Sequence, residues 1–372
     1  MIRRPPRSTQ GVSSAASDVY KRQKLFLGIA TSALLILPTY AGELAVTGGA
    51  KVTYTTSGAN GSEGSSIGVA NELDFSASGE VNGLNWNYQV QLDGATTAND
   101  DTQLTIGNDM GTIGFYISEG GMKNNLAHGV GAMGVGMDYS STSTFETGLN
   151  VNGYANVQYH TPAGMLPFDS QVKLGYVPDM NDTDMISGEG ANAAIGSHAT
   201  GRQLEQVNFS MVPVTGLTVK GDAARTVGQT GTAGSNGPEQ GVSANLGAKY
   251  SMDNGISLGY TEGGSQPAVA SGEIAYYENK FYRVQYDLPG DAWSVSYNVD
   301  KSDKNQRVKT AIGGAVGVRG TKTSTEMVQK SIMVAYTTGG VTLGFTQYKV
   351  SDADYVAGKE ESNNIASLAI SF

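Results

Sequence analysis

The stretch from Leu84 to Asp93, LNWNYQVQLD, alternates strictly between large apolar and polar side chains over ten residues. Leucine, tryptophan, tyrosine and valine occupy one parity, and asparagine, glutamine and aspartate occupy the other. A period of two is typical of a β-strand that has one apolar face and one face in contact with water. The stretch therefore predicts a strand in a sheet with two unlike faces.

The same alternation recurs along the chain, and no segment of comparable length shows a helical period. It predicts sixteen strands, at approximately 44–56, 69–80, 84–93, 102–107, 112–118, 151–160, 169–178, 202–212, 216–227, 240–251, 254–262, 273–287, 291–300, 325–338, 340–350 and 363–372. The fold class is therefore expected to be all-β.

The connections between these strands alternate in length. Those after even-numbered strands are short, as at 81–83 and 252–253, whereas most of those after odd-numbered strands are long, and the one at 119–150 is the longest. Short turns at one rim and long loops at the other are typical of a transmembrane antiparallel β-barrel. A closed barrel also pairs every backbone group without leaving an edge strand. The apolar face is then expected to contact lipid, with aromatic side chains near the strand ends.

The composition excludes several other classes of protein. The chain has 372 residues, with 51 glycines, 19 tyrosines, no cysteine and only 16% charged residues. Without cysteine there is no disulfide scaffold, thiol enzyme or cysteine-ligated metal site. The apolar run at 25–37 is too short for a bundle of transmembrane helices.

The N-terminal segment is expected to lie outside the fold. Residues 1–23 are interpreted as a non-native leader that resembles translated adapter sequence. Residues 24–41 are interpreted as a signal peptide, because basic residues precede the apolar run and small residues near Ala41 suit cleavage there. Residues 42–372 then form the barrel domain. Residues 1–41 hold six basic residues and one acidic residue, so the barrel domain carries a net charge of −15, which disfavours nucleic acid as a partner.

Motifs for catalysis or cofactor binding are weak. The glycines at 129–134 match a dinucleotide fingerprint, but no amphipathic helix follows them. Three scattered histidines do not form a metal triad, and no serine lies in a nucleophile elbow. Asp179, Asp182 and Asp184 resemble part of a calcium loop but lack its glycine and its terminal glutamate. We therefore expect no enzyme and no cofactor, and leave open a structural Ca²⁺ at these three aspartates.

The C-terminus narrows the interpretation to a family. The chain ends ASLAISF at 366–372, with Leu368, Ile370 and Phe372 on one face. This ending resembles the assembly signal of bacterial outer-membrane barrels, in which a terminal phenylalanine is recognised by the barrel-assembly machinery. Together with the signal peptide, sixteen strands and a long third loop, residues 42–372 resemble a Gram-negative general porin, most similar in style to those of alphaproteobacteria. The resemblance implies localisation in the outer membrane, contact with the bilayer and lipopolysaccharide, a homotrimer, and a third loop that folds into the lumen.

The charged residues of the inward parity and of the third loop are the candidate site. The pore constriction is expected at the loop acids Glu119, Asp138 and Glu146. The pore wall is expected at the bases Lys51, Lys173, Lys220, Lys249 and Arg283 and at the acids Glu72, Asp74 and Asp93, with further inward acids at Asp222, Asp287 and Asp300. Opposed charges across a constriction order water and select solutes by charge. Because acids outnumber bases, the lumen is expected to favour cations weakly.

The sequence therefore predicts a water-filled channel for passive diffusion of ions and small hydrophilic solutes. One alternative is a solute-specific porin for a small nutrient, which would add an aromatic track or a dense charge ladder inside the barrel. Another alternative, of a different class, is a β-sandwich or surface adhesin, because alternation with one polar face suits that fold too.

Overall fold

The computed structural model describes residues 43–59, 62–93, 101–124, 145–178, 180, 203–227, 241–267, 272–288, 292–312 and 315–371. Within these ranges, sixteen strands form a closed barrel in which each strand is antiparallel to its neighbours and β1 closes on β16. The strands are β1 (Glu43–Ala59), β2 (Ser62–Val81), β3 (Leu84–Asp93), β4 (Asp101–Asn108), β5 (Gly111–Ile117), β6 (Asn156–His160), β7 (Gln171–Val177), β8 (Gln203–Val214), β9 (Leu217–Val227), β10 (Val242–Ser251), β11 (Ile256–Gln266), β12 (Gly272–Asp287), β13 (Trp293–Ile312), β14 (Ala315–Thr338), β15 (Val341–Ser351) and β16 (Glu360–Ser371).

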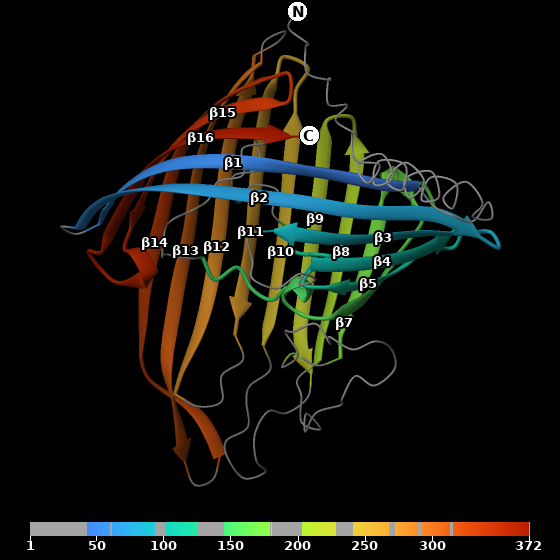
Figure 1. Cartoon of the computed structure of the whole chain (residues 1–372). Helices are drawn as coiled ribbons and strands as arrows, with labels where there is room; N and C mark the ends of the chain where they lie inside the picture. The colour runs from blue at the N-terminus through green and yellow to red at the C-terminus, as the bar shows by residue number, and fades with distance from the viewer. Residues whose placement is uncertain are drawn as a thin grey trace, which may run out of the picture.

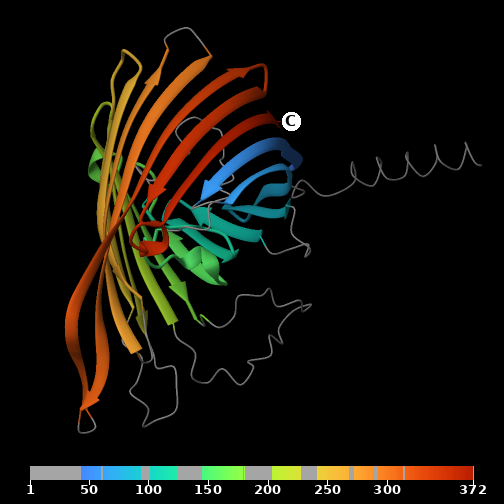
Figure 2. The same ribbon diagram turned by 90° about the vertical axis from the view of Figure 1, so that its left-hand side faces the viewer.

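The barrel confirms the predicted fold class and each of the sixteen predicted strands. In Figure 1, β1 to β5 cross in front of β8 to β13 at a steep angle, as strongly tilted strands on opposite sides of a barrel do. The side view shows the β13–β14 hairpin reaching beyond the other strands at the end with the long connections (Figure 2). In the part of the chain that is described, no helix is both long enough and apolar enough to cross a membrane.

Several predicted strand boundaries were wrong. The predicted strand 151–160 begins at Asn156, because residues 151–153 form a short 3-10 helix, η2 (Val151–Gly153). Side-chain hydrogen bonds hold this turn: the Asn156 amide donates to the carbonyl oxygens of Val151 and Tyr154. In the opposite direction, β2, β13 and β14 extend into stretches expected to be loops.

The two faces of the wall differ as the alternation predicts. Among the described residues, outward positions carry large apolar side chains, such as Leu246 and Tyr297, which are 55% and 47% exposed. Inward positions are mainly polar, and Thr261, Asn279 and Ser302 are fully buried there. A soluble barrel or sandwich would bury its apolar face, so this inverted arrangement is that of a barrel with a polar interior and an apolar outer surface.

Tight turns close one end of the barrel. Between β2 and β3, Asn82 and Gly83 have φ angles of 51° and 78°, and between β14 and β15, Gly339 and Gly340 have φ angles of 54° and 82°. Two consecutive positive φ angles define the two-residue turn that matches the twist of a β-hairpin, and glycine and asparagine adopt it at least cost. These turns fix the register of their hairpins and hence the face on which each side chain lies.

Candidate functional site

The register decides which charged residues face the interior, because residues directly opposite each other on neighbouring strands share a face. Buried Thr53 lies opposite Gly68 and Ser367, for example, which assigns the inward parity of β1, β2 and β16. Continued around the barrel, the register places on the inward face Lys51, Glu72, Asp74, Lys173, Lys220, Asp222, Lys249, Arg283, Asp287 and Asp300, and it sets the backbone of Asp93 opposite that of Glu72. These are the wall residues that the sequence indicated, and their role in a pore stays a prediction.

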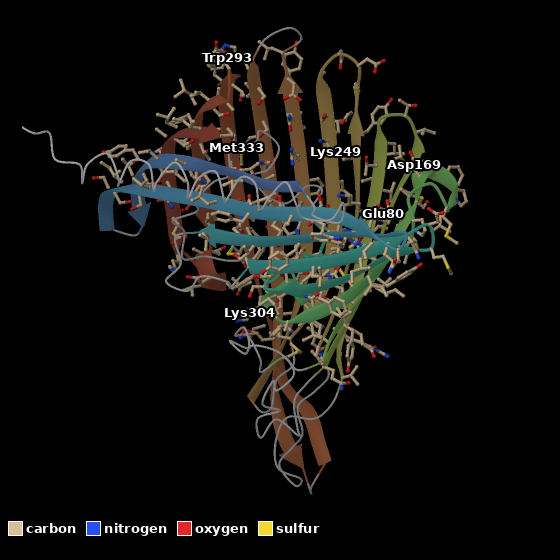
Figure 3. All side chains as sticks on the ribbon, turned by 45° about the vertical axis from the view of Figure 1, so that its right-hand side comes forward. Glu80, Asp169, Lys249, Trp293, Lys304 and Met333 are labelled. Atoms are coloured by element: carbon tan, nitrogen blue, oxygen red, sulfur yellow. The ribbon has the colours of Figure 1, made fainter. Side chains whose placement is uncertain are left out.

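The inward bases gather on one side of the wall. Lys249 on β10 and Arg283 on β12 lie on either side of Gly259 in the register, and Lys220 lies on β9 next to β10. Lys173 on β7 extends the group. Within the described chain, no ion pair within 4.0 Å joins any of these four bases to a carboxylate. They form a basic band toward the short-turn end, where Figure 3 shows Lys249, and the inward carboxylates Asp287 and Asp300 lie near Arg283 without forming an ion pair with it.

The inward acids of the first strands face this band. Glu72 and Asp74 lie on β2, the backbone of Asp93 lies opposite Glu72, and Asp101 at the start of β4 shares their face. Strands eight places apart in a sixteen-strand barrel lie on opposite sides, so β2 to β4 face β10 to β12. The Asp74 carboxylate accepts a hydrogen bond from Gln89 at 3.1 Å. The first strands are therefore mainly acidic on the inside, whereas β7 to β13 carry these four bases together with the acids Asp222, Asp287 and Asp300.

The first flank of the long connection between β5 and β6 is fixed to this inner face. The backbone N–H of Asn124 donates to the Asp222 carboxylate at 2.6 Å, and the Asn124 amide donates to the Lys220 carbonyl oxygen at 3.1 Å. Asn208 donates to the carbonyl oxygen of Met122 at 2.7 Å. These contacts reach from β5 to β8 and β9, so the flank crosses the polar face of the wall.

The second flank makes equivalent contacts further around the barrel. Ser265 and Asn279 both donate to the Glu146 carbonyl oxygen, at 3.2 and 3.0 Å. The N–H of Leu149 donates to Ser243, and the N–H of Glu146 donates to the Tyr355 hydroxyl. Glu146 is one of the three predicted constriction acids, and its neighbourhood therefore lies against β10 to β12.

Two small apolar clusters support the flanks inside the barrel. One contains Met122, Val151, Val177, Leu204 and Ala224, and the other contains Met327, Tyr348, Val350, Ala353 and Ile365 with Phe145 and Tyr355 packed against it. The aromatic rings of Phe145 and Phe281 meet edge to face with their centroids 5.7 Å apart. Close-packed apolar contacts have low compressibility, so these clusters limit the movement of the two flanks.

The structure adds residues that the sequence reasoning missed. Lys123 donates to the Gly148 carbonyl oxygen at 3.0 Å, which ties the two flanks together, and burial lowers the pKa of this lysine. Lys304 lies on the inward face of β13 with its ammonium 5.8 Å from the centre of the Tyr355 ring. Tyr355 comes from η4 (Ala353–Tyr355), and burial raises the pKa of its hydroxyl. Parity could have identified Asp101 and Lys304, but no sequence signal places Tyr355 or Lys123.

Other predicted residues lie outside the described residues. They are the leader and signal peptide, the glycine motif at 129–134, Asp138, the calcium candidates Asp179, Asp182 and Asp184, and Phe372. Glu119 is described: its carboxylate accepts a hydrogen bond from the N–H of Gly120, and its carbonyl oxygen accepts one from Asn156. Within the described ranges, no group of three or more histidine, cysteine or acidic side chains is placed to hold a metal ion.

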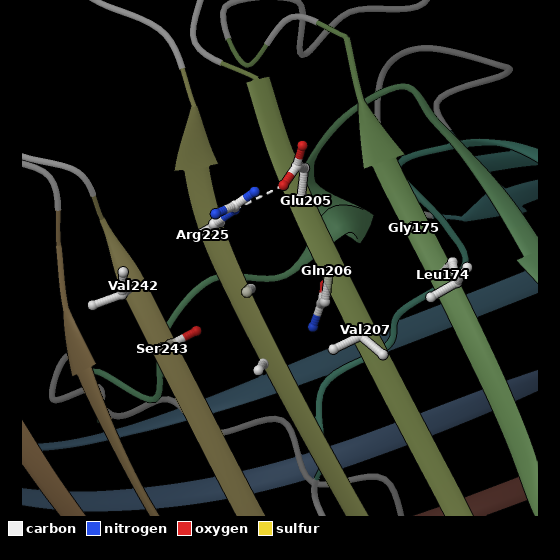
Figure 4. Close-up of a pocket in the computed structure, with 10 residues that line it drawn as sticks. Leu174, Gly175, Glu205, Gln206, Val207, Arg225, Val242 and Ser243 are labelled. Atoms are coloured by element: carbon white, nitrogen blue, oxygen red, sulfur yellow. Dashed lines mark hydrogen bonds and ion pairs between the residues drawn. The ribbon is translucent and has the colours of Figure 1, made fainter.

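A groove of about 540 Å³ lies in the outer surface, away from the charged inner face (Figure 4). Leu174, Val207 and Val242 line it from the apolar side of the wall, and the ion pair between Glu205 and Arg225, 2.7 Å long, closes one end. Because Leu174, Val207 and Val242 belong to the outward parity, the groove opens on the outer face of the wall. Gln206 and Ser243 also line it, but their side chains accept hydrogen bonds from the N–H groups of Val151 and Leu149 on the inner side.

Comparison with solved structures identifies the fold. The outer-membrane expressed OmpT of Vibrio cholerae superimposes with a TM-score of 0.58 at 13% identity, over 91% of this chain and 100% of that one. An anion-selective porin from Comamonas acidovorans gives 0.56 at 12% identity, over 89% and 100%, and Salmonella typhi OmpF in complex with daunomycin gives 0.51 at 12%, over 89% and 98%. No family model matches the sequence, and no curated protein matches it. The chain therefore has the fold of the outer-membrane porins, and the comparisons do not select the alphaproteobacterial type.

Proposed function

We propose that this protein is a water-filled channel in the outer membrane of a Gram-negative bacterium, through which ions and small hydrophilic solutes diffuse passively. The observation that carries the proposal is the closed sixteen-strand wall with an apolar outer face and a polar, charged inner face. Such a wall satisfies every backbone group in lipid and leaves the inside to water. The proposal includes no catalysis and no cofactor, although a structural Ca²⁺ at Asp179, Asp182 and Asp184 stays a proposal.

The long connection between β5 and β6 is proposed to fold into the lumen and form the constriction. Both of its described flanks hydrogen-bond to inward side chains of β8 to β12, which supports this placement. The negative charges of the constriction would then be those of Glu119, Asp138 and Glu146. They would lie on the long-connection side of the basic band of Lys173, Lys220, Lys249 and Arg283. Lys51, Glu72, Asp74 and Asp93 would line the wall around it.

Assembly and surroundings are also proposals. Phe372 would be the signal for the barrel-assembly machinery after removal of a signal peptide at 24–41, and the assembled protein would be a homotrimer in contact with lipid and lipopolysaccharide. Selectivity is proposed to favour cations weakly, because inward acids outnumber inward bases among the residues named above.

A solute-specific porin is the second candidate. Tyr277 and Tyr355 meet with their ring centroids 5.3 Å apart, close to Lys304, which is the kind of aromatic group that holds a sugar. These two rings pack on each other, and Tyr355 also packs against the buried cluster that contains Met327 and Tyr348, so they do not present a row of open faces. The general channel is therefore the better supported function.

Single-channel recording of the purified protein in a planar bilayer tests the proposal. Large, ohmic current steps in potassium chloride are expected, without saturation as salt is raised. Absence of current steps from protein that has inserted as a heat-modifiable barrel would contradict a channel and favour a surface or structural role. Saturation by one sugar or organic acid, with a blocked current, would favour the solute-specific alternative.

A further inference from the structure

The connection between β15 and β16 folds back against the inner face of the wall. It contains η4, and Ala353 at the start of η4 is fully buried. This alanine packs in one of the two apolar clusters, among inward side chains of β14, β15 and β16. An alanine in a connection that extended past the rim of the barrel would be exposed to water. We call residues 352–359 the inner strap.

Three residues of the inner strap have a left-handed backbone conformation. The φ angles of Asp352, Asp354 and Tyr355 are 52°, 55° and 59°. This conformation costs free energy for residues other than glycine, and it persists only where the surrounding structure determines it. Here the Asp352 carboxylate accepts a hydrogen bond from the N–H of Gly358 at 2.6 Å, and the Asp354 carboxylate pairs with the Lys359 ammonium. The inner strap is therefore held in one shape.

Tyr355 joins the inner strap to the wall and to the long connection between β5 and β6. Its hydroxyl lies 2.7 Å from the hydroxyl of Ser302 on β13, and it accepts a hydrogen bond from the N–H of Glu146 at 3.4 Å. Its ring meets the ring of Tyr277 on β12 with the centroids 5.3 Å apart, and the Lys304 ammonium lies 5.8 Å from its centre. One side chain therefore contacts two strands of the wall and the second flank of the long connection.

The Tyr355 hydroxyl is itself held in place. Ser302 is fully buried, and its hydroxyl shares a hydrogen bond with Tyr355. A buried hydroxyl that loses its partner costs free energy, because no water replaces the lost hydrogen bond. Movement of the tyrosine away from the wall would leave Ser302 in that state. The tyrosine oxygen therefore stays where the N–H of Glu146 reaches it.

The second flank is held between the inner strap and the wall. The N–H of Glu146 donates to the strap, and its carbonyl oxygen accepts hydrogen bonds from Ser265 and Asn279 on the wall. The preceding residue, Phe145, packs against the same apolar cluster that buries Ala353. Two adjacent residues of the flank thus depend on the strap for part of their contacts.

The first flank is held differently. Asn124 bonds to Asp222 and to the backbone of Lys220, and Met122 accepts a hydrogen bond from Asn208. Between described residues, no hydrogen bond joins residues 118–124 to the inner strap. The two flanks of one connection therefore have separate supports, which allows the support of each to be tested alone.

We propose that the inner strap supports the constriction and that Tyr355 is its positioning residue. The Tyr355 hydroxyl fixes the backbone at Glu146 and, through it, the second half of the long connection. The proposal rests on the channel and on the placement of the long connection in the proposed function. A change in the strap, close to the C-terminal end of the chain, then alters the current through the pore without changing any charge of the lumen.

Hydrogen exchange of the folded barrel in detergent micelles, measured by mass spectrometry, tests the support without reference to current. Tyr355→Phe keeps the ring and removes the hydroxyl. Amides at 145–150 should then exchange about 2- to 10-fold faster, which is the factor that one hydrogen bond supplies. Exchange at 118–124 should not change, because that flank has its own support. Ser302→Ala should accelerate exchange in the same segment by a smaller factor, because the Tyr355 hydroxyl stays but loses its partner on the wall.

Tyr277→Phe is the matched control. It removes a hydroxyl from the neighbouring ring, and no hydrogen bond is described between that hydroxyl and the second flank. Exchange at 145–150 should therefore be that of the unmodified protein. Unchanged exchange there in Tyr355→Phe, or the same acceleration in Tyr277→Phe, would overturn the proposal. Equal acceleration of both flanks in Tyr355→Phe would also overturn it, since that result indicates a general loosening of the barrel.

Single-channel recording then connects the inner strap to the pore. The open-channel current of Tyr355→Phe should be noisier, because the released flank is populated about 2- to 10-fold more often. Its reversal potential should stay the same, because no charge has changed. Faster exchange at 145–150 without added noise would overturn the role of the strap in the constriction. A silent recording from every variant would contradict the channel itself, and the exchange measurement would still decide whether Tyr355 holds the flank.

Discussion

Tyr88 and Gln89 are adjacent in sequence and lie on opposite faces of β3. Tyr88 is 42% exposed on the outer face. Gln89 points inward, where its amide donates to Asp74 and its carbonyl oxygen accepts from Gln103. Two adjacent residues therefore face lipid and the polar interior, respectively. This allows the assignment of the outer and inner faces to be tested with single substitutions.

Tyr88→Arg should destabilise the inserted barrel by about 2–4 kcal/mol, the cost of a charge on the lipid face near mid-membrane. Gln89→Arg should cost much less, because the new guanidinium faces water and lies close to Asp74. Urea unfolding titrations of both variants in lipid bilayers measure the difference. Equal destabilisation of the two variants would show that the sidedness is wrong.

Asp222 is a positioning residue for the first flank of the β5–β6 connection. Its carboxylate accepts hydrogen bonds from the N–H of Asn124 at 2.6 Å and from Asn245 at 3.1 Å. Asp222→Ala should lower the free energy of unfolding by about 1–3 kcal/mol, because it leaves buried donors without an acceptor. The released flank should also make the open-channel current noisier.

The control for Asp222→Ala is Asp74→Ala, which removes an inward carboxylate bonded to Gln89 on the wall. No hydrogen bond joins Asp74 to the described flanks at 118–124 and 145–155. Open-channel noise that rises equally in both variants would mean that Asp222 acts only through the charge of the lumen.

At the scale of elements, the alternation was sufficient to locate a strand where one face is clearly apolar and the other clearly polar. β3 was predicted to the residue, and β10 within two residues, because large apolar and polar side chains alternate without a break. The extension of β13 was missed because residues 302–307, SDKNQR, are polar on both faces beyond the apolar band, so no period remains to be detected. A strand that leaves the apolar surroundings loses its sequence signature but keeps its backbone pairing.

The flanks of the long connection could not be located from sequence. The flanks are held by residues on four different strands: Asp222, Ser243, Ser265 and Asn279. Nothing in the sequence distinguishes these residues from the other polar residues of the inward face. Their positions relative to one another depend on the register of the whole barrel. The sequence therefore indicated which residues face inward. Only the closed barrel shows that these four residues contact the same connection between β5 and β6.

Assembly can be tested at the last strand. β16 pairs with β15 and β1 along its length, and Ile370 lies opposite both Val341 and Ala50. Phe372 lies beyond the described residues, so its role as an assembly signal stays a prediction. Phe372→Ser should reduce the yield of heat-modifiable protein in the outer membrane, while molecules that do insert should keep normal conductance, because the pairing of β16 is unchanged. Ser371→Ala is the neighbouring control, and a normal yield of Phe372→Ser would refute the signal.

At the scale of the whole molecule, the acids of the first strands lie across the barrel from most of the inward bases, and Asp222, Asp287 and Asp300 lie among those bases. Glu72, Asp74 and Asp101 lie on the first strands, and Lys249 and Arg283 lie on strands across the barrel. A transverse field of this kind favours neither ion by itself, because both signs are present. The sign of the selectivity is set by the excess of one charge and by which side lies nearer the narrowest section.

Selectivity is therefore expected to respond in opposite directions to changes on the two sides. Residues 42–372 carry a net charge of −15, so the unmodified protein should give a reversal potential in a salt gradient that favours cations. The preference should grow as salt is diluted and fade near 1 M, where the Debye length falls from about 10 Å to about 3 Å. Glu119→Gln with Asp138→Asn should shift the potential toward anions, and Lys249→Gln with Arg283→Gln should shift it further toward cations. Shifts in the same direction, or anion preference in the unmodified protein, would mean that the basic band dominates the narrowest section and that the acids of the long connection lie away from it.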